Sequence, residues 1–273
     1  MSESTLSSKS SFELLDDRGY TATVYRIPGT KKVCKISLEK CQHTNFLAEK
    51  IAYERFAARK PPSTIPRYYG IDENHPGGLL LEYAEKGNLR DYLFLCNMIE
   101  QSPPSPELIY RWARQAAEAL SFAHSCGVLH ADIHCSNFLL DSNYDLKVAD
   151  FAGASIDGSK SWSCYRYSHR LFEPGDNDGT KGKGMKITVR SEIFAMGSAM
   201  YAMVQGHDPF VELEYANDWE GVKRRILEKE MPDISCLPIL GDVIRRCWDL
   251  EYAIMEEVLD AIELERCSSW SHL

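Results

Sequence analysis

The chain has 273 residues, of which 44% are hydrophobic and 26% charged, a composition typical of a globular protein with a sizeable core. Its formal net charge of −9 argues against nonspecific nucleic-acid binding, and no apolar run is long enough to cross a bilayer. The Ser-rich residues 1–11 lack the apolar segment of a signal peptide, so we expect a short disordered tail. The nine cysteines are scattered without a C-x-x-C pair, which indicates a reducing compartment without a disulfide framework or a structural zinc site.

The first third of the chain is rich in strand patterns. Segments 21–27 and 33–37 alternate and contain many β-branched residues, and a turn separates them. Segment 44–60 has helical periodicity, with Thr44 as a candidate N-cap and the following prolines as a stop. Segments 67–73 and 79–84 predict two further strands around a turn.

The remainder of the chain is mostly helical. A hairpin is expected where 137–140 and 146–150 flank a turn. Helical periodicity occupies six segments: 88–96, 105–127, 191–206, 219–230, 240–249 and 254–267. The sequence therefore predicts an α+β protein with a small antiparallel lobe over residues 12–83 and a larger, mostly helical lobe over 84–273. The two would form one domain over 12–265, with a hinge near 83–87.

Three polar residues surround the expected hairpin. Asp132 and Asn137 lie five residues apart just before it, and Asp150 follows it. Because a hairpin returns the chain beside its start, Asn137 and Asp150 can face each other across a small cleft. A carboxylate and a carboxamide oxygen suit Mg²⁺, and Asp132 is left to accept a proton from an attacking hydroxyl. This is the equipment of phosphoryl transfer, although each residue alone could be a turn or cap residue.

These residues resemble two motifs of the protein kinase family, His-Arg-Asp-x-x-x-x-Asn and Asp-Phe-Gly. The corresponding segments here are "HADIHCSN" from His130 and "DFA" from Asp150. The resemblance implies that Asp132 is the catalytic base, that Asn137 and Asp150 hold magnesium, and that His130 and Phe151 pack in an internal apolar spine. "SEIFAMGSAMYAMVQGHDPF" and the later Cys-Trp pair also resemble this family, so the likeness extends from about residue 12 to 262.

The family also requires a lysine on the third strand, paired with a helix glutamate, and Lys35 fits this role. Glu49 is the favoured partner because it shares an apolar helix face, where an unpaired charge would be costly, whereas Glu54 points elsewhere. Leu81 resembles the gatekeeper, and the backbone of Glu82–Ala84 would meet the adenine. Further nucleotide contacts are implied for Gly19, Val24, Val33, Lys35, Glu49, Leu81, Glu82, Ala84 and Leu139.

The nucleotide-binding motifs depart from the family pattern. In "DRGYTATV" only Gly19 of three expected glycines remains, and Asp17 and Ala22 replace the others. Glycines allow the backbone to approach phosphate, so weaker nucleotide binding is expected. Val33 replaces the usual alanine above the adenine, where overpacking costs about 1–3 kcal/mol.

The catalytic loop and the segment after it also depart from the pattern. Ala131 replaces an arginine that anchors a phosphorylated activation loop, which predicts a kinase not switched on by that phosphate. His134 replaces the lysine that contacts the transferred phosphate, and it could act in catalysis or be purely structural. Glu192 replaces the aspartate that braces the catalytic loop, and Ala152 replaces the glycine of Asp-Phe-Gly. Phe172-Glu173-Pro174 stands where Ala-Pro-Glu is expected.

The resemblance favours a protein kinase that uses ATP and Mg²⁺ and phosphorylates a protein hydroxyl, more readily Ser/Thr than Tyr. Two alternatives stay open: a pseudokinase that serves as a scaffold, and a small-molecule or tRNA-complex-type phosphotransferase. We expect a monomeric, cytoplasmic or nuclear protein with a protein substrate, without membrane association and without nucleic acid as a partner.

Overall fold

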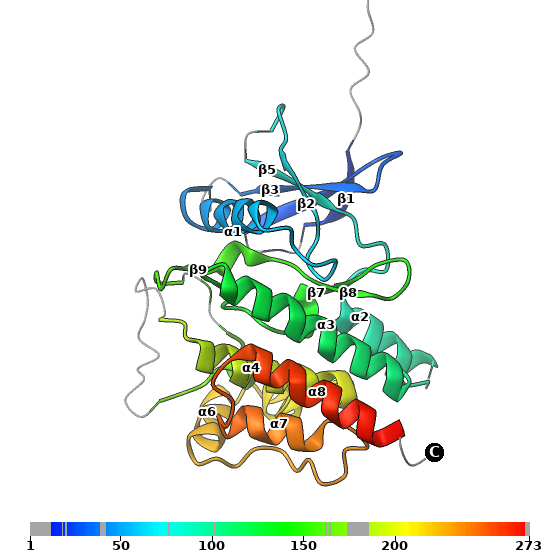
Figure 1. Cartoon of the computed structure of the whole chain (residues 1–273), viewed down its shortest axis with the longest axis vertical. Helices are drawn as coiled ribbons and strands as arrows, with labels where there is room; N and C mark the ends of the chain where they lie inside the picture. Colours follow the sequence, from blue (N-terminus) through cyan, green and yellow to red (C-terminus); the bar gives the residue numbers. More distant parts are fainter. Residues whose placement is uncertain are drawn as a thin grey trace, which may run out of the picture.

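The computed structural model describes residues 12–17, 19, 21–38, 42–75, 77–100, 102–161, 163, 165–173 and 186–270. A strand-rich N-terminal lobe lies above a larger helical lobe, which confirms the predicted α+β, two-lobed fold (Figure 1). The expected tail over 1–11 and residues 174–185, a segment rich in Gly and Lys, lie outside the described residues. Within the described ranges no helix combines the length and apolarity that crossing a membrane requires.

Five antiparallel strands form the sheet of the N-terminal lobe, in the order β1-β2-β3-β5-β4. Their bounds are Glu13–Asp16 for β1, Ala22–Ile27 for β2, Lys32–Ser37 for β3, Tyr68–Ile71 for β4 and Gly78–Glu82 for β5. The register pairs Val33 with Leu81 and Lys35 with Val24. Because cross-strand partners share a face and alternate residues of a strand do too, these four side chains lie on one face of the sheet.

Helix α1 (Leu47–Ala58) is the main helix of this lobe. It begins later than expected, because residues Gln42–Phe46 form a π-helical turn that runs into it. Thr44 lies inside that turn and the N-cap position is Phe46, which makes no side-chain cap hydrogen bond. The prediction of Thr44 as the N-cap was therefore wrong: the helical path continues through this residue, so it does not stand at a terminus with open N–H groups.

The helices predicted for the C-terminal lobe are confirmed. They are α2 (Leu89–Phe94), α3 (Pro106–Ser125), α4 (Val189–Gln205), α6 (Trp219–Leu227), α7 (Gly241–Trp248) and α8 (Met255–Trp270), and the short α5 (Val211–Tyr215) was not predicted. Residues Leu95–Glu100 continue α2 as a π-helical segment. Local caps fix the ends: Asn88 and Ser105 accept N-terminal N–H groups, and Gly206 closes α4 in the left-handed conformation.

Two small antiparallel pairs lie between the lobes. The predicted hairpin is confirmed as β7 (Phe138–Leu140) and β8 (Leu146–Val148). A second pair, β6 (Val128–Leu129) and β9 (Ser155–Ile156), was not predicted. Its strands are only two residues long, too short for a sequence signal. Together the pairs hold the segment between α3 and β7 beside the segment that follows β8.

Candidate active site

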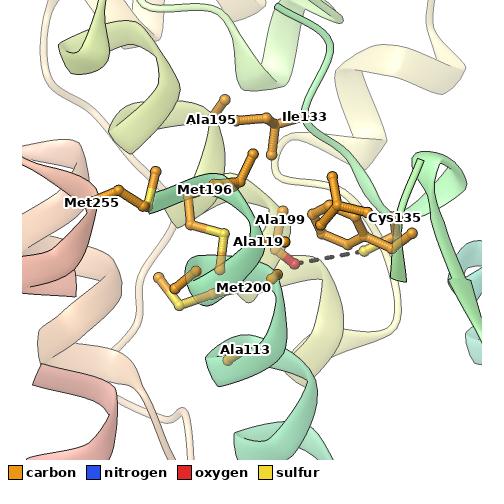
Figure 2. Packing of buried hydrophobic residues seen from close by; sticks show 14 of the residues in the cluster. Ala113, Ala119, Ile133, Cys135, Ala195, Met196, Ala199, Met200 and Met255 are labelled. Atoms are coloured by element: carbon orange, nitrogen blue, oxygen red, sulfur yellow. Dashed lines mark hydrogen bonds between the residues drawn. The ribbon is translucent and has the colours of Figure 1, made fainter. Parts of the chain in front are cut away.

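The loop between β6 and β7 carries the candidate catalytic residues, and alternate residues anchor it. Ile133 and Cys135 are buried and pack against α4, where they meet Ala195 and Ala199 (Figure 2). The thiol of Cys135 donates to the carbonyl oxygen of Ala199 at 3.6 Å. Asp132 lies between Ile133 and Ala131, which is also buried, and 26% of its side chain is exposed. Core packing on both sides therefore fixes the position of a carboxylate that faces the cleft.

Glu192, the first buried residue of α4, fixes the backbone of the same loop through hydrogen bonds. Its carboxylate accepts the backbone N–H groups of His130 at 2.8 Å and Ala131 at 2.9 Å, and it also accepts from Tyr165. Ala131 is buried with a φ of 69°, a left-handed conformation that is costly for alanine. Burial would raise the pKa of Glu192, but His124 at 3.2 Å and its other donors hold that pKa below the usual value. An ionised carboxylate thus secures a strained backbone.

Asp132, His134 and Asn137 form a connected group. The amide Nδ2 of Asn137 donates to the backbone oxygen of Asp132 at 2.8 Å and to its Oδ2 at 3.2 Å. Nε2 of His134 lies 3.2 Å from Oδ1 of Asp132. Nδ1 of His134 accepts the N–H of Ser136 at 3.2 Å. The structure therefore brings together the carboxylate of Asp132, the carboxamide of Asn137 and the ring of His134, which the sequence placed in one loop.

Lys35 bridges the two lobes. Its ammonium lies 2.8 Å from Oε1 of Glu49 on α1 and 2.6 Å from Oδ1 of Asp150 beyond β8. Burial would lower the pKa of Lys35, but the two carboxylates raise it above its ordinary value, so the charge persists. For Asp150, burial acts to raise the pKa and Lys35 overcomes it. Glu54 instead pairs with Lys50 at the surface, which leaves Glu49 as the partner of Lys35.

Asn137 and Asp150 are suited to a hard cation. Among the described residues, the side-chain hydrogen bonds of Asn137 all run through Nδ2, so its Oδ1 stays available. The ion pair of Asp150 uses Oδ1, and its carboxylate also accepts a backbone hydrogen bond from Ala152, so lone pairs remain for a cation. One carboxamide and one carboxylate oxygen fit Mg²⁺, which keeps several waters and shares phosphate oxygens. Elsewhere in the described part of the chain, no group of three or more His, Cys, Asp or Glu side chains offers another metal site.

A cavity of about 510 Å³ between the lobes fits a nucleotide. Its lining contains ten of the residues predicted from the sequence: Gly19, Val24, Val33, Lys35, Glu49, Leu81, Glu82, Asn137, Leu139 and Asp150. Ala84 is buried and is not part of this lining. Asp132 and His134 line an adjoining cavity of about 450 Å³, which shares Gly19, Asn137 and Asp150 with the first. The predicted nucleotide-binding residues other than Ala84 thus line the first cavity, and Asp132 and His134 line the cavity next to it.

Gly19 is the one glycine that remains of the three expected in the phosphate loop, and Val33 replaces the usual alanine. The structure shows a local role for each. A Cβ on Gly19 would lie 2.8 Å from the carbonyl oxygen of Ala22, so the turn before β2 requires glycine there. Val33 is buried opposite Leu81 and reduces the space on that wall of the cavity. Asp17 is exposed and is absent from the lining residues of both cavities.

Four rings form a column that links the lobes. His130 and Phe151 have centroids 4.7 Å apart, Phe151 and Tyr53 5.7 Å, and Tyr53 and Tyr68 5.9 Å. Nε2 of His130 also lies 2.9 Å from the carbonyl oxygen of Ala149. The column joins the loop before β7, the turn after Asp150, α1 and β4, so it holds the helix that carries Glu49 against the turn that follows Asp150.

Two arginines of the site were missed by the sequence interpretation: Arg90, which lines the first cavity, and Arg166. Arg166 follows Tyr165 in the segment after β9 and lines both cavities. The only signal in the sequence was the lack of a lysine or arginine between Asp132 and Asn137, which indicates that a cation has to come from another segment.

The fold and this arrangement of side chains define a protein of the kinase class. The chain belongs to the protein kinase family, because the family model for the protein kinase domain matches residues 19–251. That match begins at Gly19 and includes every candidate site residue described above.

Relatives with this domain come from distant organisms. The chain is 26% identical over 206 residues to the probable serine/threonine-protein kinase PBL28 of Arabidopsis thaliana, covering 68% of this chain and 54% of the relative. It is 30% identical over 190 residues to the serine/threonine-protein kinase GIN4 of Saccharomyces cerevisiae, covering 69% and 15%. It is 25% identical over 193 residues to the human NUAK family SNF1-like kinase 1, covering 70% and 28%. The chain therefore spans about half of the first relative and less of the other two.

Proposed function

We propose that the chain is an active protein kinase that uses ATP and Mg²⁺ to phosphorylate a serine or threonine hydroxyl of a protein, with residues 12–265 as its catalytic domain. The observation that carries the proposal is the position of Lys35, whose ammonium contacts both Glu49 and Asp150. In this family catalysis requires the lysine–glutamate ion pair together with an aspartate, here Asp150, that is placed to hold magnesium. The serine/threonine preference rests on the names of the relatives PBL28 and GIN4.

The residues of the site divide the work of phosphoryl transfer. Asp132 would accept the proton of the acceptor hydroxyl as its oxygen forms a bond to the γ-phosphorus, while the bond from that phosphorus to the bridging oxygen breaks and ADP leaves. Lys35 would hold phosphate oxygens of the nucleotide. Asn137 and Asp150 would hold magnesium, which when bound neutralises phosphate charge. Most of the rate enhancement would come from this positioning and charge stabilisation.

A pseudokinase is the second candidate, because Asp17 and Ala22 replace two phosphate-loop glycines and Val33 narrows the cavity. A measurement of nucleotide binding distinguishes the pseudokinase from the active kinase proposed above. A ligand at 100 times its Kd stabilises a protein by about 2.7 kcal/mol. We expect millimolar Mg-ATP to raise the melting temperature. No change at that concentration would contradict the kinase proposal.

The acceptor distinguishes a protein kinase from a small-molecule phosphotransferase. The purified chain would be incubated with ATP labelled at the γ-phosphate and, in parallel, with a mixed protein substrate or with small hydroxylated acceptors such as aminoglycosides and choline. We expect label on serine and threonine of the protein and none on the small acceptors. Label on the small acceptors and none on the protein would instead indicate a small-molecule phosphotransferase.

A further inference from the structure

His134 stands where the family has a phosphate-contacting lysine, but its ring is already engaged. Nδ1 accepts from the N–H of Ser136, which puts the proton of a neutral imidazole on Nε2. That nitrogen lies 3.2 Å from Oδ1 of Asp132. Only 8% of the side chain is exposed. His134 is thus positioned to orient Asp132, and its ring has no further donor for a phosphate.

Arg166 brings a positive charge to the same place from another segment. Nη2 donates to the hydroxyl of Ser136 at 3.0 Å, directly before Asn137 in the catalytic loop. Nη1 donates to Oδ2 of Asp208 at 3.2 Å. A guanidinium has five N–H donors. Within the described ranges these are the two hydrogen bonds of its side chain, so donors remain for an anion.

Asp208 fixes the guanidinium from the protein interior. Its side chain is only 6% exposed, and it lies in the turn after α4. Burial would raise the pKa of Asp208, but His169, Arg166 and Arg90 hold it below the usual value, so the carboxylate stays charged. A charged, buried anchor keeps the arginine in one orientation, as transition-state stabilisation by a preorganised group requires.

Arg166 also lies where the two cavities of the site meet. It lines the nucleotide cavity and the adjoining cavity that contains Asp132, and the residues common to both linings include Asn137 and Asp150. The junction of the two cavities is where a phosphate would pass from nucleotide to acceptor. About a quarter of the Arg166 side chain is exposed.

We infer that Arg166 is the residue that binds the γ-phosphate of ATP and stabilises its transfer, in place of the lysine that His134 replaces. This inference rests on the proposed function, since it names the cation that acts at that site. Arginine suits the role because its planar fork can keep one edge on Asp208 and Ser136 and present other N–H groups to phosphate oxygens.

The test removes the charge without leaving Asp208 as an unpaired buried carboxylate. The double variant Arg166→Gln/Asp208→Asn keeps a hydrogen-bonding pair, and Asp208→Asn alone reports the loss of the anchor. Arg225→Gln is the matched control, because Arg225 pairs with Glu212 on the surface of α6. Circular dichroism and melting temperature establish folding. Calorimetry gives the Kd of Mg-ATP and of Mg-ADP, and a transfer assay gives kcat.

In the folded double variant we expect the Kd of Mg-ATP to rise at least tenfold, that of Mg-ADP to change less than twofold, and kcat to fall about 100-fold. Adding Ser136→Arg, which returns a guanidinium to the catalytic loop, should restore part of kcat and the preference for ATP. An unchanged Kd for Mg-ATP and an unchanged kcat in a folded double variant would overturn the inference and leave the proposed function intact.

The affinities for Mg-ATP and Mg-ADP also test the role of Arg166 if the wild-type chain transfers no phosphate. In that case the proposed function fails. A selective loss of Mg-ATP affinity would still support Arg166 as the γ-phosphate ligand, and equal changes for both nucleotides would contradict it.

Discussion

Arg55 on α1 and Asp157 after β9 form a two-point contact between the lobes. Nη1 of Arg55 lies 2.8 Å from Oδ1 of Asp157, and Nη2 lies 2.5 Å from Oδ2. Nη1 also donates to the carbonyl oxygen of Cys126 at 3.0 Å. A Cβ on Gly127 would lie 2.5 Å from Oδ1 of Asp157, so glycine makes this approach possible. The contact fixes the rotation of α1 that turns Glu49 toward Lys35.

Breaking this contact should reduce catalysis without abolishing folding. Arg55→Ala is expected to lower kcat/KM roughly tenfold, because a small displacement of α1 misplaces Glu49 and Lys35. The exchange Arg55→Asp/Asp157→Arg should recover part of the loss. Lys50→Ala serves as the control, since Lys50 pairs with Glu54 elsewhere on α1. Steady-state kinetics with varied ATP would check this, and equal kcat/KM in Arg55→Ala and wild type would exclude a positioning role.

Activity should not require phosphorylation of the segment after β9. Ala131 removes the usual phosphate anchor, and the segment is held by direct contacts instead. Tyr165 donates to Glu192, and the hydroxyl of Ser161 donates to the carbonyl oxygen of Gly153 at 2.5 Å. Chain purified after phosphatase treatment should keep full activity, as should Ser159→Ala. A large loss in either sample, measured as initial rate, would show that a phosphate is needed.

Glu192 should be critical for stability. Its removal in Glu192→Ala leaves the buried N–H groups of His130 and Ala131 without an acceptor, at a cost of about 1–3 kcal/mol each. We expect a loss of roughly 2–5 kcal/mol in the free energy of unfolding, measured in urea. Glu192→Asp restores the usual family residue but shortens the side chain, so an intermediate loss is expected. A loss below about 1 kcal/mol in the alanine variant would contradict the bracing role.

His169 should make the fold sensitive to mild acid. Burial lowers its pKa from 6.5 to about 4, against the opposing effect of Asp208, with His134 and Arg166 adding to the decrease. Because the unfolded state takes up a proton first, His169 costs no stability above about pH 6.5 and progressively more as pH falls toward 4. The total loss in the free energy of unfolding that His169 causes is roughly 3 kcal/mol.

The variant His169→Gln isolates this effect from the carboxylates that titrate in the same range. Urea unfolding of both proteins at pH 7.5 and pH 4.5 gives the comparison. The difference in unfolding free energy between the two pH values should be smaller for the variant. Identical pH dependence in the two proteins would mean that His169 is not buried in its neutral form.

Most of the fold followed from local patterns in the sequence. The alternation in β2, the long periodicity of α3 and the hairpin turn each predicted an element that the structure contains. The start of α1 did not follow, because a π-helical turn has no distinctive composition. The pair β6 and β9 depends on contacts between distant segments, which a local pattern cannot indicate.

The candidate site was predictable where spacing carried the information. Asp132, Asn137 and Asp150 were found because a loop and a hairpin fix their separation along the chain. Arg166 was not found, because its place in the cleft depends on the tertiary contact with Asp208. Ala84 was assigned through the family's backbone contact to adenine, and the structure places its side chain outside the cavity lining.

The central claim is that Asp132 acts as the base in phosphoryl transfer to protein. The most direct measurement compares transfer of labelled γ-phosphate to a protein substrate by the wild-type chain and by Asp132→Asn, with Mg-ATP affinity measured in both. The account predicts transfer by the wild type, at least a 100-fold lower rate in the variant and a similar Kd for Mg-ATP. Equal transfer by the two proteins, or none by a wild-type chain that binds Mg-ATP, would contradict it.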